Sequence, residues 1–172
     1  SIVTKIPKVK IILYNFEKLS GYKFTADVVK RLVEKYPKNI IGCKDSSYNL
    51  FEDLKLPNFF MFPGSEAKLL KGLKVGCAGC ISAVTNVTHQ LSREVFDDFE
   101  NKSEQRSNKK LISIRETFDQ LHLISGLHSF MSVNDKNYEN LLPPLVLLSE
   151  EKKRELILNL KSIELMQESV IQ

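Results

Sequence analysis

Four apolar runs alternate with helical patterns over the first hundred residues, and this alternation restricts the fold more than any other feature of the sequence. The runs are VKIILY at 9–14, NIIGCK at 39–44, FFMFPG at 59–64 and CAGCISAV at 77–84. Apolar residues at helical spacing follow each run. Near-continuous apolar strands that alternate with helices are typical of parallel sheets covered on both faces. The sequence therefore predicts an α/β fold with four β/α units.

The helical segments carry their own start and end signals. Thr25 is a suitable N-cap for a helix that runs to Tyr36, because Pro37 disfavours helical backbone in the residue before it. Further helices are predicted over 49–55, over 65–74 with an end at Gly76, and over 88–100. Because each helix follows a strand, the order strand, loop, helix repeats along this part of the chain.

Beyond Asn101 the strand patterns cease. Apolar residues at helical spacing predict helices over 111–121, within 126–142 and from Ser149 onward. We therefore expect two regions, β/α units over residues 1–100 and a helical extension over residues 101–172 that packs on them.

The number of β/α units leaves two architectures open, an open four-stranded sheet or half of an eight-stranded barrel. A complete (β/α)8 barrel needs roughly 250 residues, and this chain has 172. The opening segment SIVTKIP has the character of a helix end. This favours a half barrel, and we expect the front of the larger domain to be supplied elsewhere.

Composition and charge exclude several classes of protein. The sequence is 42% hydrophobic and 27% charged, which is ordinary for a folded domain, and its net charge of +4 does not gather with aromatic residues on one face as in nucleic-acid binders. Apolar stretches stay far below the roughly 18 residues of a membrane span, and no basic-then-apolar leader opens the sequence. We expect a cytoplasmic protein with neither nucleic acid nor membrane as a partner.

The three cysteines suit a reducing compartment, since an odd number without a secretory signal does not suggest a disulfide framework. Cys77 and Cys80 have the C-x-x-C spacing of a redox or zinc pair. They lie in a run of small and apolar residues, and no second pair of ligands follows. We interpret them as strand residues and expect no metal.

Polar residues follow the predicted strands at the points where each strand ends. These residues are Tyr14 and Asn15, then Lys44 to Ser47, then Gly64, Ser65 and Glu66, and finally Ser82 and Ala83. In parallel β/α folds the carboxyl ends of the strands meet at one edge, where active sites are built. The sequence therefore predicts a site at this edge.

Lys44 is the residue in this set with the most specific chemistry. A lysine at the end of an apolar strand is partly desolvated, and this raises the fraction of neutral amine that can attack a ketone and form a Schiff base. Alternatively, Lys44 pairs with Asp45 or is solvated in the loop. Tyr14 ends the preceding strand, and its phenol could relay protons to the amine or simply fill the end of a barrel.

Motifs in these segments, taken together, resemble one family. YNFEKLSGYKFT at 14–25, IIGCKDSS at 40–47, FPGSE at 62–66 and GCAGCISAVTNV at 76–87 are similar, in this order, to the second half of the N-acetylneuraminate lyase and dihydrodipicolinate synthase family, which includes the 2-keto-3-deoxygluconate aldolases. LPPLVLLSEEKKREL at 142–156 is similar to the C-terminal helices of that family. The resemblance covers residues 9–87 and part of the tail.

The resemblance implies strands 5–8 of a (β/α)8 TIM barrel followed by a helical extension. It places the Schiff-base lysine on Lys44 and the proton-relay tyrosine on Tyr14. Substrate contacts are implied for the loops at Gly64, Ser65 and Glu66 and at Ser82 and Ala83. No metal or organic cofactor is implied, and self-association is, because members are commonly tetramers.

Two positions depart from the family pattern. Glu17 stands where the family usually has a proline. Leu19 stands where dihydrodipicolinate synthases have an arginine for the carboxylate of the second substrate, and KLSG is instead similar to the neuraminate lyases. The carboxylate-gripping loop of the family's first half has no counterpart here, so we expect no activity from this chain alone.

These observations predict a class I lyase or aldolase that acts on pyruvate and 2-keto-3-deoxy sugar acids. Its partners are then a 2-keto acid, further copies of the chain, and an N-terminal half-barrel from the same or another polypeptide. The alternatives are a dihydrodipicolinate synthase, which condenses pyruvate with aspartate semialdehyde, a 2-keto-3-deoxy acid dehydratase, a non-catalytic truncated or degenerate barrel half, and an oligomeric scaffold.

Overall fold

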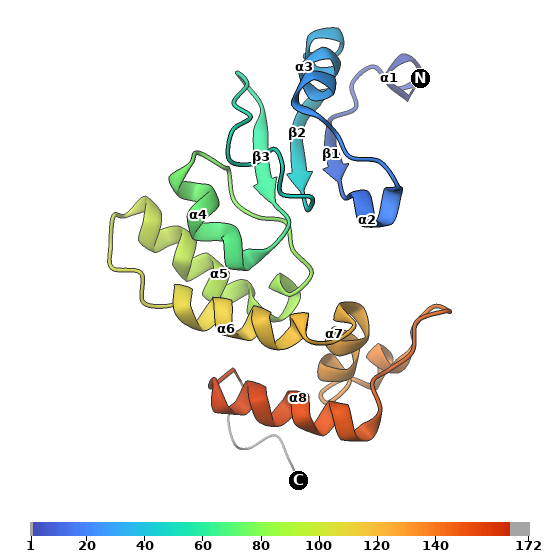
Figure 1. The fold of residues 1–172 in the computed structure, drawn as a ribbon, viewed down its shortest axis with the longest axis vertical. Coiled ribbons are helices and arrows are strands. Elements are labelled where there is room, and N and C mark those ends of the chain that lie inside the picture. Colours follow the sequence, from blue (N-terminus) through green and yellow to red (C-terminus); the bar gives the residue numbers. More distant parts are fainter. Residues whose placement is uncertain (1, 166–172) are drawn as a thin grey trace. The chain divides into compact units, whose positions relative to one another are not determined.

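The computed structural model describes residues 2–165, and its contacts divide the chain into two compact units, Ser1–Ser82 and Ala83–Gln172 (Figure 1). The first unit contains a parallel sheet with helices, and the second is helical. The sequence predicts a different boundary, near residue 100, between the β/α units and the helical extension. That boundary refers to the units of a barrel and stays a prediction.

The first unit is built on a three-stranded parallel sheet in the order β1-β2-β3 (Figure 1). Its elements are α1 (Ile2–Lys5), β1 (Ile11–Asn15), α2 (Glu17–Ser20), α3 (Ala26–Lys35), β2 (Ile40–Asp45), β3 (Phe60–Pro63), the 3-10 helix η1 (Glu66–Lys68) and α4 (Leu69–Lys74). The α/β class and three of the predicted strands are thereby confirmed.

Local signals set the ends of the helices as the sequence predicts. The Thr25 side chain accepts a hydrogen bond from the backbone N–H of Val28 and caps α3, which gives way at Tyr36 before Pro37. Gly76 follows the end of α4 with a φ of 87°, a value that glycine adopts without strain.

The predicted fourth strand is wrong. Residues 77–82 have no regular secondary structure, although they run beside β3: Ala78 N–H donates to Met61 O at 3.0 Å and Ile81 N–H to Pro63 O at 3.2 Å. Gly79 lies between these two bonds with a φ of 149°, which breaks the strand geometry. The segment therefore occupies the place next to β3 without forming a ladder.

The predicted short helix over 49–55 is also wrong, because this stretch forms turns. One helical turn is present, in which Leu54 N–H donates to Leu50 O at 2.9 Å. The N–H groups of Leu50 and Phe51 donate instead to the Asp45 side chain.

The sheet of the first unit has one covered and one bare face. Leu13, Cys43 and Met61 alternate onto the covered face, where they pack with Val29 of α3 and with Phe51. The opposite face carries the side chains between them, which the register aligns in two rows: Ile12, Gly42 and Phe60, then Tyr14, Lys44 and Phe62. The apolar core of this unit therefore lies on one side of the sheet.

The second unit is a bundle of helices with its own core. Its elements are α5 (Thr85–Glu100), α6 (Asn108–Asp119), α7 (Leu123–Met131), the 3-10 helix η2 (Lys136–Glu139) and α8 (Glu150–Ser162). Ile114, Phe118, Leu127, Leu156 and Leu160 are buried together in its core. The predicted helical tail is confirmed up to residue 165, and its last seven residues lie outside the described part. Ser149 is the N-cap of α8, and its side chain accepts a hydrogen bond from Lys152 N–H.

Helix α5 begins earlier than the predicted residue 88. Thr88 interrupts it with non-helical backbone angles, and its hydroxyl donates to Val84 O at 3.0 Å.

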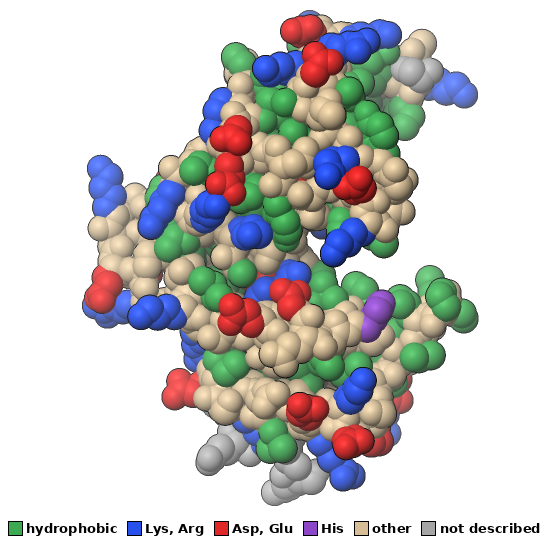
Figure 2. Space-filling view, in the orientation of Figure 1, with side chains coloured by type: hydrophobic (Ala, Val, Ile, Leu, Met, Phe, Trp, Pro, Cys, Tyr) green, Lys and Arg blue, Asp and Glu red, His purple; other side chains and the backbone are tan. Residues whose placement is uncertain are grey.

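On the face that Figure 2 shows, acidic and basic side chains are mixed along the part of the second unit formed by α8. None of the helices within residues 2–165 is both long and apolar enough to cross a membrane.

Candidate active site

Backbone hydrogen bonds tie the carboxyl ends of the three strands into one edge. Ser46 N–H donates to Asn15 O at 2.8 Å, which links the end of β2 to the end of β1, and Gly64 N–H donates to Asp45 O at 2.9 Å, which links β3 to β2. The ladder thus continues past the strands into the loops. The predicted strand-end residues of the first unit therefore start from one common edge.

Lys44 and Tyr14 are direct neighbours on the bare face. They are partners in the register of β1 and β2, and the Lys44 Nζ atom lies 4.2 Å from the centre of the Tyr14 ring. The lysine is half-buried, and the tyrosine side of the pair is open, with 47% of Tyr14 exposed. A cation over an aromatic face is attracted by the ring quadrupole, so the contact positions the amine.

Asp45 has a different role from its neighbour. Because successive strand residues point to opposite faces, its carboxylate lies on the covered side of the sheet, where it is fully buried. Its two oxygens accept five N–H groups, from the Asn15 side chain and from the backbones of Ser47, Tyr48, Leu50 and Phe51. The carboxylate therefore holds the loop after β2, and it is not the ion-pair partner considered for Lys44.

Asn15 extends this buried network, which the sequence analysis missed. Its amide nitrogen donates to Asp45 and to Asn49, each at 2.8 Å, and its oxygen accepts from Phe24 N–H at 2.9 Å. Asn49 in turn donates to Phe24 O. One signal for it was available in the sequence. The apolar strand β1 ends in Tyr14 and Asn15, and because adjacent strand residues point to opposite faces, only one of them can face the bare side.

Gly64 is required by packing between the loops. A Cβ atom at this position would stand 2.0 Å from Ser46 Oγ and 2.9 Å from Ser46 Cα, distances that no side chain can occupy. The absence of a side chain therefore lets the loops after β2 and β3 approach each other. This places the Ser46 hydroxyl and the Gly64 backbone together at the site edge.

Glu66 and Ser82, two residues that the sequence predicts separately for the site, contact each other. The Glu66 side chain is fully buried in η1 and accepts a hydrogen bond from the Ser82 hydroxyl. Ser65 beside it is also buried. The Glu66 carboxylate thus joins the loop after β3 to the end of the 77–82 segment. Ala83, the remaining predicted residue, is half-buried and packs against the core of the second unit.

Glu17, the departure from the expected proline, takes part in the loop after β1. Its N–H donates to Ser47 Oγ at 3.0 Å, and its carboxylate lies 2.9 Å from the Lys23 ammonium. A proline here would remove the N–H that reaches the loop after β2. Leu19, the other departure, is well exposed on α2.

The three cysteines are free thiols, of which Cys43 and Cys77 are buried and Cys80 is half-buried. Burial and the negative charge of Asp45 raise the pKa of Cys43 to about 12, and burial with the charge of Glu66 raises the pKa of Cys80 to about 12. Burial also raises the pKa of Cys77, whose thiol donates to Phe51 O. Thiols held protonated are poor nucleophiles and metal ligands. Within residues 2–165 no three His, Cys, Asp or Glu side chains are grouped to hold a metal ion.

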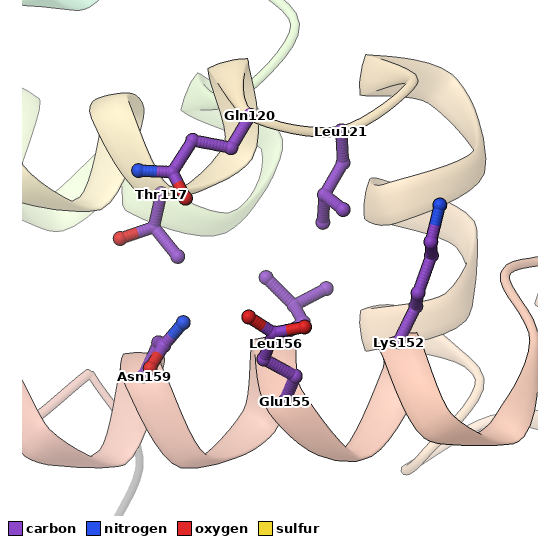
Figure 3. Close-up of a pocket in the computed structure, with 7 residues that line it drawn as sticks. All are labelled: Thr117, Gln120, Leu121, Lys152, Glu155, Leu156 and Asn159. Atoms are coloured by element: carbon purple, nitrogen blue, oxygen red, sulfur yellow. The ribbon is translucent and has the colours of Figure 1, made fainter.

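A cavity of about 170 Å³ lies elsewhere, between α6 and α8 in the second unit (Figure 3). Polar groups of Thr117, Gln120 and Asn159 surround it, with Leu121 and Leu156 beside them. It contains none of the strand-end residues.

Comparison with known proteins gives a consistent family. Residues 1–163 match the Dihydrodipicolinate synthetase family. The 4-hydroxy-tetrahydrodipicolinate synthase of Archaeoglobus fulgidus is 29% identical in an alignment 173 positions long, and the alignment covers 91% of this chain and 56% of the relative. A probable 2-dehydro-3-deoxy-D-pentonate aldolase of Escherichia coli, YjhH, is 28% identical in an alignment 157 positions long, and the alignment covers 83% of this chain and 52% of the relative.

Solved structures agree with this match. YagE of Escherichia coli, a prophage protein of the dihydrodipicolinic acid synthase family determined in complex with pyruvate, superposes with a TM-score of 0.81 at 25% identity, covering 91% of this chain and 57% of that one. The dihydrodipicolinate synthase of Cyanidioschyzon merolae has the same fold over 96% of this chain and 58% of its own, with a TM-score of 0.80 at 19% identity. The chain spans about half the length of the relatives that it matches.

Proposed function

Because the chain belongs to the dihydrodipicolinate synthetase family, we propose that it carries the nucleophile-bearing part of a class I lyase or aldolase that acts on pyruvate and 2-keto-3-deoxy sugar acids. The observation that carries the proposal is the strand-end pair, in which the Lys44 amine lies 4.2 Å from the Tyr14 ring centre on the bare face of the sheet. The pyruvate complex of YagE supports the choice of substrate class.

In the proposed mechanism the neutral Lys44 amine attacks the C2 carbonyl of the keto acid. The carbonyl oxygen takes up two protons, one from the amine nitrogen and one from the acid that the relay supplies, and it leaves as water, so that a protonated Schiff base remains. The Tyr14 hydroxyl, on the neighbouring strand, relays the protons of these steps. The positive nitrogen then accepts the electron pair released when the bond between C3 and C4 breaks, so the lysine itself serves as the electron sink. No metal or organic cofactor enters these steps.

The remaining strand-end residues are assigned to substrate contacts. We place Ser65, Glu66 and Ser82 around the hydroxylated part of the substrate, and Gly64 and Ala83 in the backbone that shapes the same loops. The Glu66 carboxylate is buried and holds Ser82, so it fixes the Ser82 hydroxyl in position. Ser46, which lies against Gly64, is added to this set.

A dihydrodipicolinate synthase is the second candidate, and the name of the Archaeoglobus relative favours it. Leu19 favours the sugar-acid aldolase instead, because an exposed apolar side chain cannot hold the carboxylate of aspartate semialdehyde as an arginine would. A dehydratase of 2-keto-3-deoxy acids and a non-catalytic barrel half are the remaining alternatives. A cytoplasmic location and a homotetramer belong to the same proposal.

Borohydride trapping tests the proposal. The chain is combined with the part of the barrel that it does not match, taken from the Archaeoglobus relative, treated with pyruvate and borohydride, and digested for peptide mass spectrometry. A reduced pyruvyl adduct on Lys44 is expected. Absence of the adduct in a complex shown to have formed would rule out the lyase in favour of the non-catalytic barrel half.

Substrate choice is tested in the same complex. Cleavage of 2-keto-3-deoxy sugar acids to pyruvate should be faster than condensation of pyruvate with aspartate semialdehyde. Replacing Leu19 by Arg should shift this ratio toward condensation. The opposite ratio in the unmodified protein would assign it to the synthases.

A further inference from the structure

The cavity between α6 and α8 in the second unit has two polar walls that face each other (Figure 3). Thr117 and Gln120 line it from the last turn of α6, and Glu155 and Asn159 point toward them from α8. The half-buried Leu121 adds an apolar wall beside them. Polar groups from two helices therefore converge on one space.

The volume of the cavity limits the size of what it can hold. Its 170 Å³ is ample for several water molecules, since one water needs about 10–15 Å³ of such space. Sites for larger organic ligands measure about 300–1,000 Å³. A ligand of a few non-hydrogen atoms therefore fits.

The polar groups around the cavity are rich in hydrogen-bond acceptors. The Thr117 hydroxyl donates its proton to Ser113 O at 3.0 Å, so toward the cavity it can only accept. The side chains of Gln120, Glu155 and Asn159 make no hydrogen bond or ion pair with another residue of 2–165. A carboxylate accepts only, and each amide supplies a carbonyl oxygen. The cavity therefore suits a ligand with several N–H donors.

Glu155 gives the cavity a negative charge that helix stability does not explain. Glu150 and Glu151 lie in the first turn of α8, where the helix dipole favours carboxylates, whereas Glu155 lies beyond that turn. A more open hollow of about 490 Å³ shares Glu155 and Asn159 with the cavity, and Glu150, Glu151 and Arg154 also line it. Three carboxylates thus stand against one guanidinium beside the cavity, and this charge balance attracts a cation.

We propose that this cavity binds a small primary amine, whose ammonium donates to Glu155 and Asn159 and whose short alkyl chain lies against Leu121. An ammonium combines three N–H donors with one positive charge, and hydrogen bonds between ions of opposite charge are the strong ones. The inference goes beyond the proposed function and does not depend on the chemistry of Lys44.

Lys152 distinguishes two sources of this amine. Its side chain lines the same cavity and extends away from Glu155 (Figure 3). An amino acid would place its carboxylate at Lys152 and its ammonium at Glu155. A plain alkylamine would leave Lys152 in contact with solvent only.

NMR titration of the isotope-labelled purified chain with n-butylamine tests the proposal. The side-chain amide signals of Gln120 and Asn159 should shift and saturate. Butyltrimethylammonium, which has the charge without the N–H donors, should not shift them. Glu155→Gln should weaken binding of n-butylamine at least tenfold, because it removes a hydrogen bond between two ions.

Glu116→Gln is the matched control, since it removes the same charge from an exposed position on α6 that does not line the cavity. It should leave the affinity for n-butylamine within about twofold, because a fully solvated charge outside the cavity is strongly screened. Both glutamates are exposed, so the thermal unfolding midpoint of each variant without ligand should equal that of the unmodified chain.

γ-Aminobutyrate separates the two sources. If the ligand is an amino acid, γ-aminobutyrate should bind more tightly than n-butylamine, and Lys152→Gln should remove this gain; without the gain the ligand is a plain amine. Three results would overturn the proposal: no saturable shift with either amine, equal binding of butyltrimethylammonium, or equal affinity of Glu155→Gln and Glu116→Gln. Potassium chloride that alone produces the same shifts would make this an inorganic cation site and overturn it too.

Discussion

The two faces of the sheet in the first unit have opposite surroundings. On the covered face Cys43 and Met61 are buried under α3 and the loop after β2, whereas on the bare face Ile12, Tyr14 and Phe60 are exposed. The same strands supply both faces, so the difference comes from alternation alone. The covered face therefore supplies the stability of the unit, and the bare face carries its proposed chemistry.

The strand ends repeat this division one residue apart. Asn15 and Asp45 point to the covered side and hold loops through buried hydrogen bonds, and Tyr14 and Lys44 point to the bare side and contact each other. Substitutions on the two sides should therefore affect different measurements. Covered-side changes should lower the free energy of unfolding, and bare-side changes should alter formation of the pyruvyl adduct.

Asp45→Ala should give the largest loss of stability. It removes the acceptor of five N–H groups, several of them buried, and each unsatisfied buried donor costs about 1–3 kcal/mol. We expect a loss of about 5 kcal/mol in the first unit, measured by hydrogen exchange of its peptides in increasing urea. Asp53→Ala, at an exposed position in the same loop, is the control and should change little. Similar effects of the two variants would contradict the role given to Asp45.

Phe51→Ala and Ile12→Ala compare the faces directly. Phe51 is fully buried in the core of the first unit, so its truncation should cost about 3–5 kcal/mol. Ile12 is 43% exposed, and its truncation should change the free energy of unfolding by less than about 0.5 kcal/mol. Equal losses in urea unfolding would mean that the bare face also stabilises the isolated chain.

Gly64→Ala should destabilise the site edge by about 1–3 kcal/mol, because the new methyl group would overlap the Ser46 side chain. Ser46→Gly in the same chain removes the two closest atoms and should recover part of the loss in the same urea experiment. A neutral Gly64→Ala would show that the loops after β2 and β3 lie further apart than described.

Cys43 should make stability depend on alkaline pH. Its pKa is about 12 in the folded chain against an ordinary value of 9.0, so the fold favours the protonated thiol. The resulting stability is complete below pH 9 and is lost as the pH rises from 9 toward 12. Between pH 8 and pH 10 the unmodified chain should lose about 1 kcal/mol more than Cys43→Ala in urea unfolding. Parallel pH profiles would contradict the burial of this thiol.

Local patterns in the sequence were sufficient for three strands, for α3 with its Thr25 cap, and for the pairing of Tyr14 with Lys44. These depend on alternation, capping and the order of β/α units, all of which are visible within short windows. The two wrong predictions, the strand over 77–84 and the helix over 49–55, failed for reasons that a short window does not show. Gly79 reads as a small strand residue but has a φ of 149°, and the turn after Asn49 forms because Asp45 captures the N–H groups of Leu50 and Phe51.

The buried network of Asn15, Asp45 and Asn49 could not be predicted for a similar reason. Its contacts join residues 30 or more positions apart, and the sequence does not show which polar strand-end residue turns inward. Lys44 was predicted as the nucleophile because its neighbours form a motif, and this role stays a prediction. Asp45, in the same motif, was considered only as an ion-pair partner.

The central claim is that Lys44, and no other lysine, is the nucleophile. Lys68 provides a matched control, since its Nζ atom lies 4.6 Å from the ring centre of Tyr48 but is not at a strand end. In the complex with the complementary portion, Lys44→Arg should abolish the borohydride-trapped pyruvyl adduct measured by intact mass, while Lys68→Arg should retain it. An adduct that persists in Lys44→Arg at the level of the unmodified chain would contradict the account.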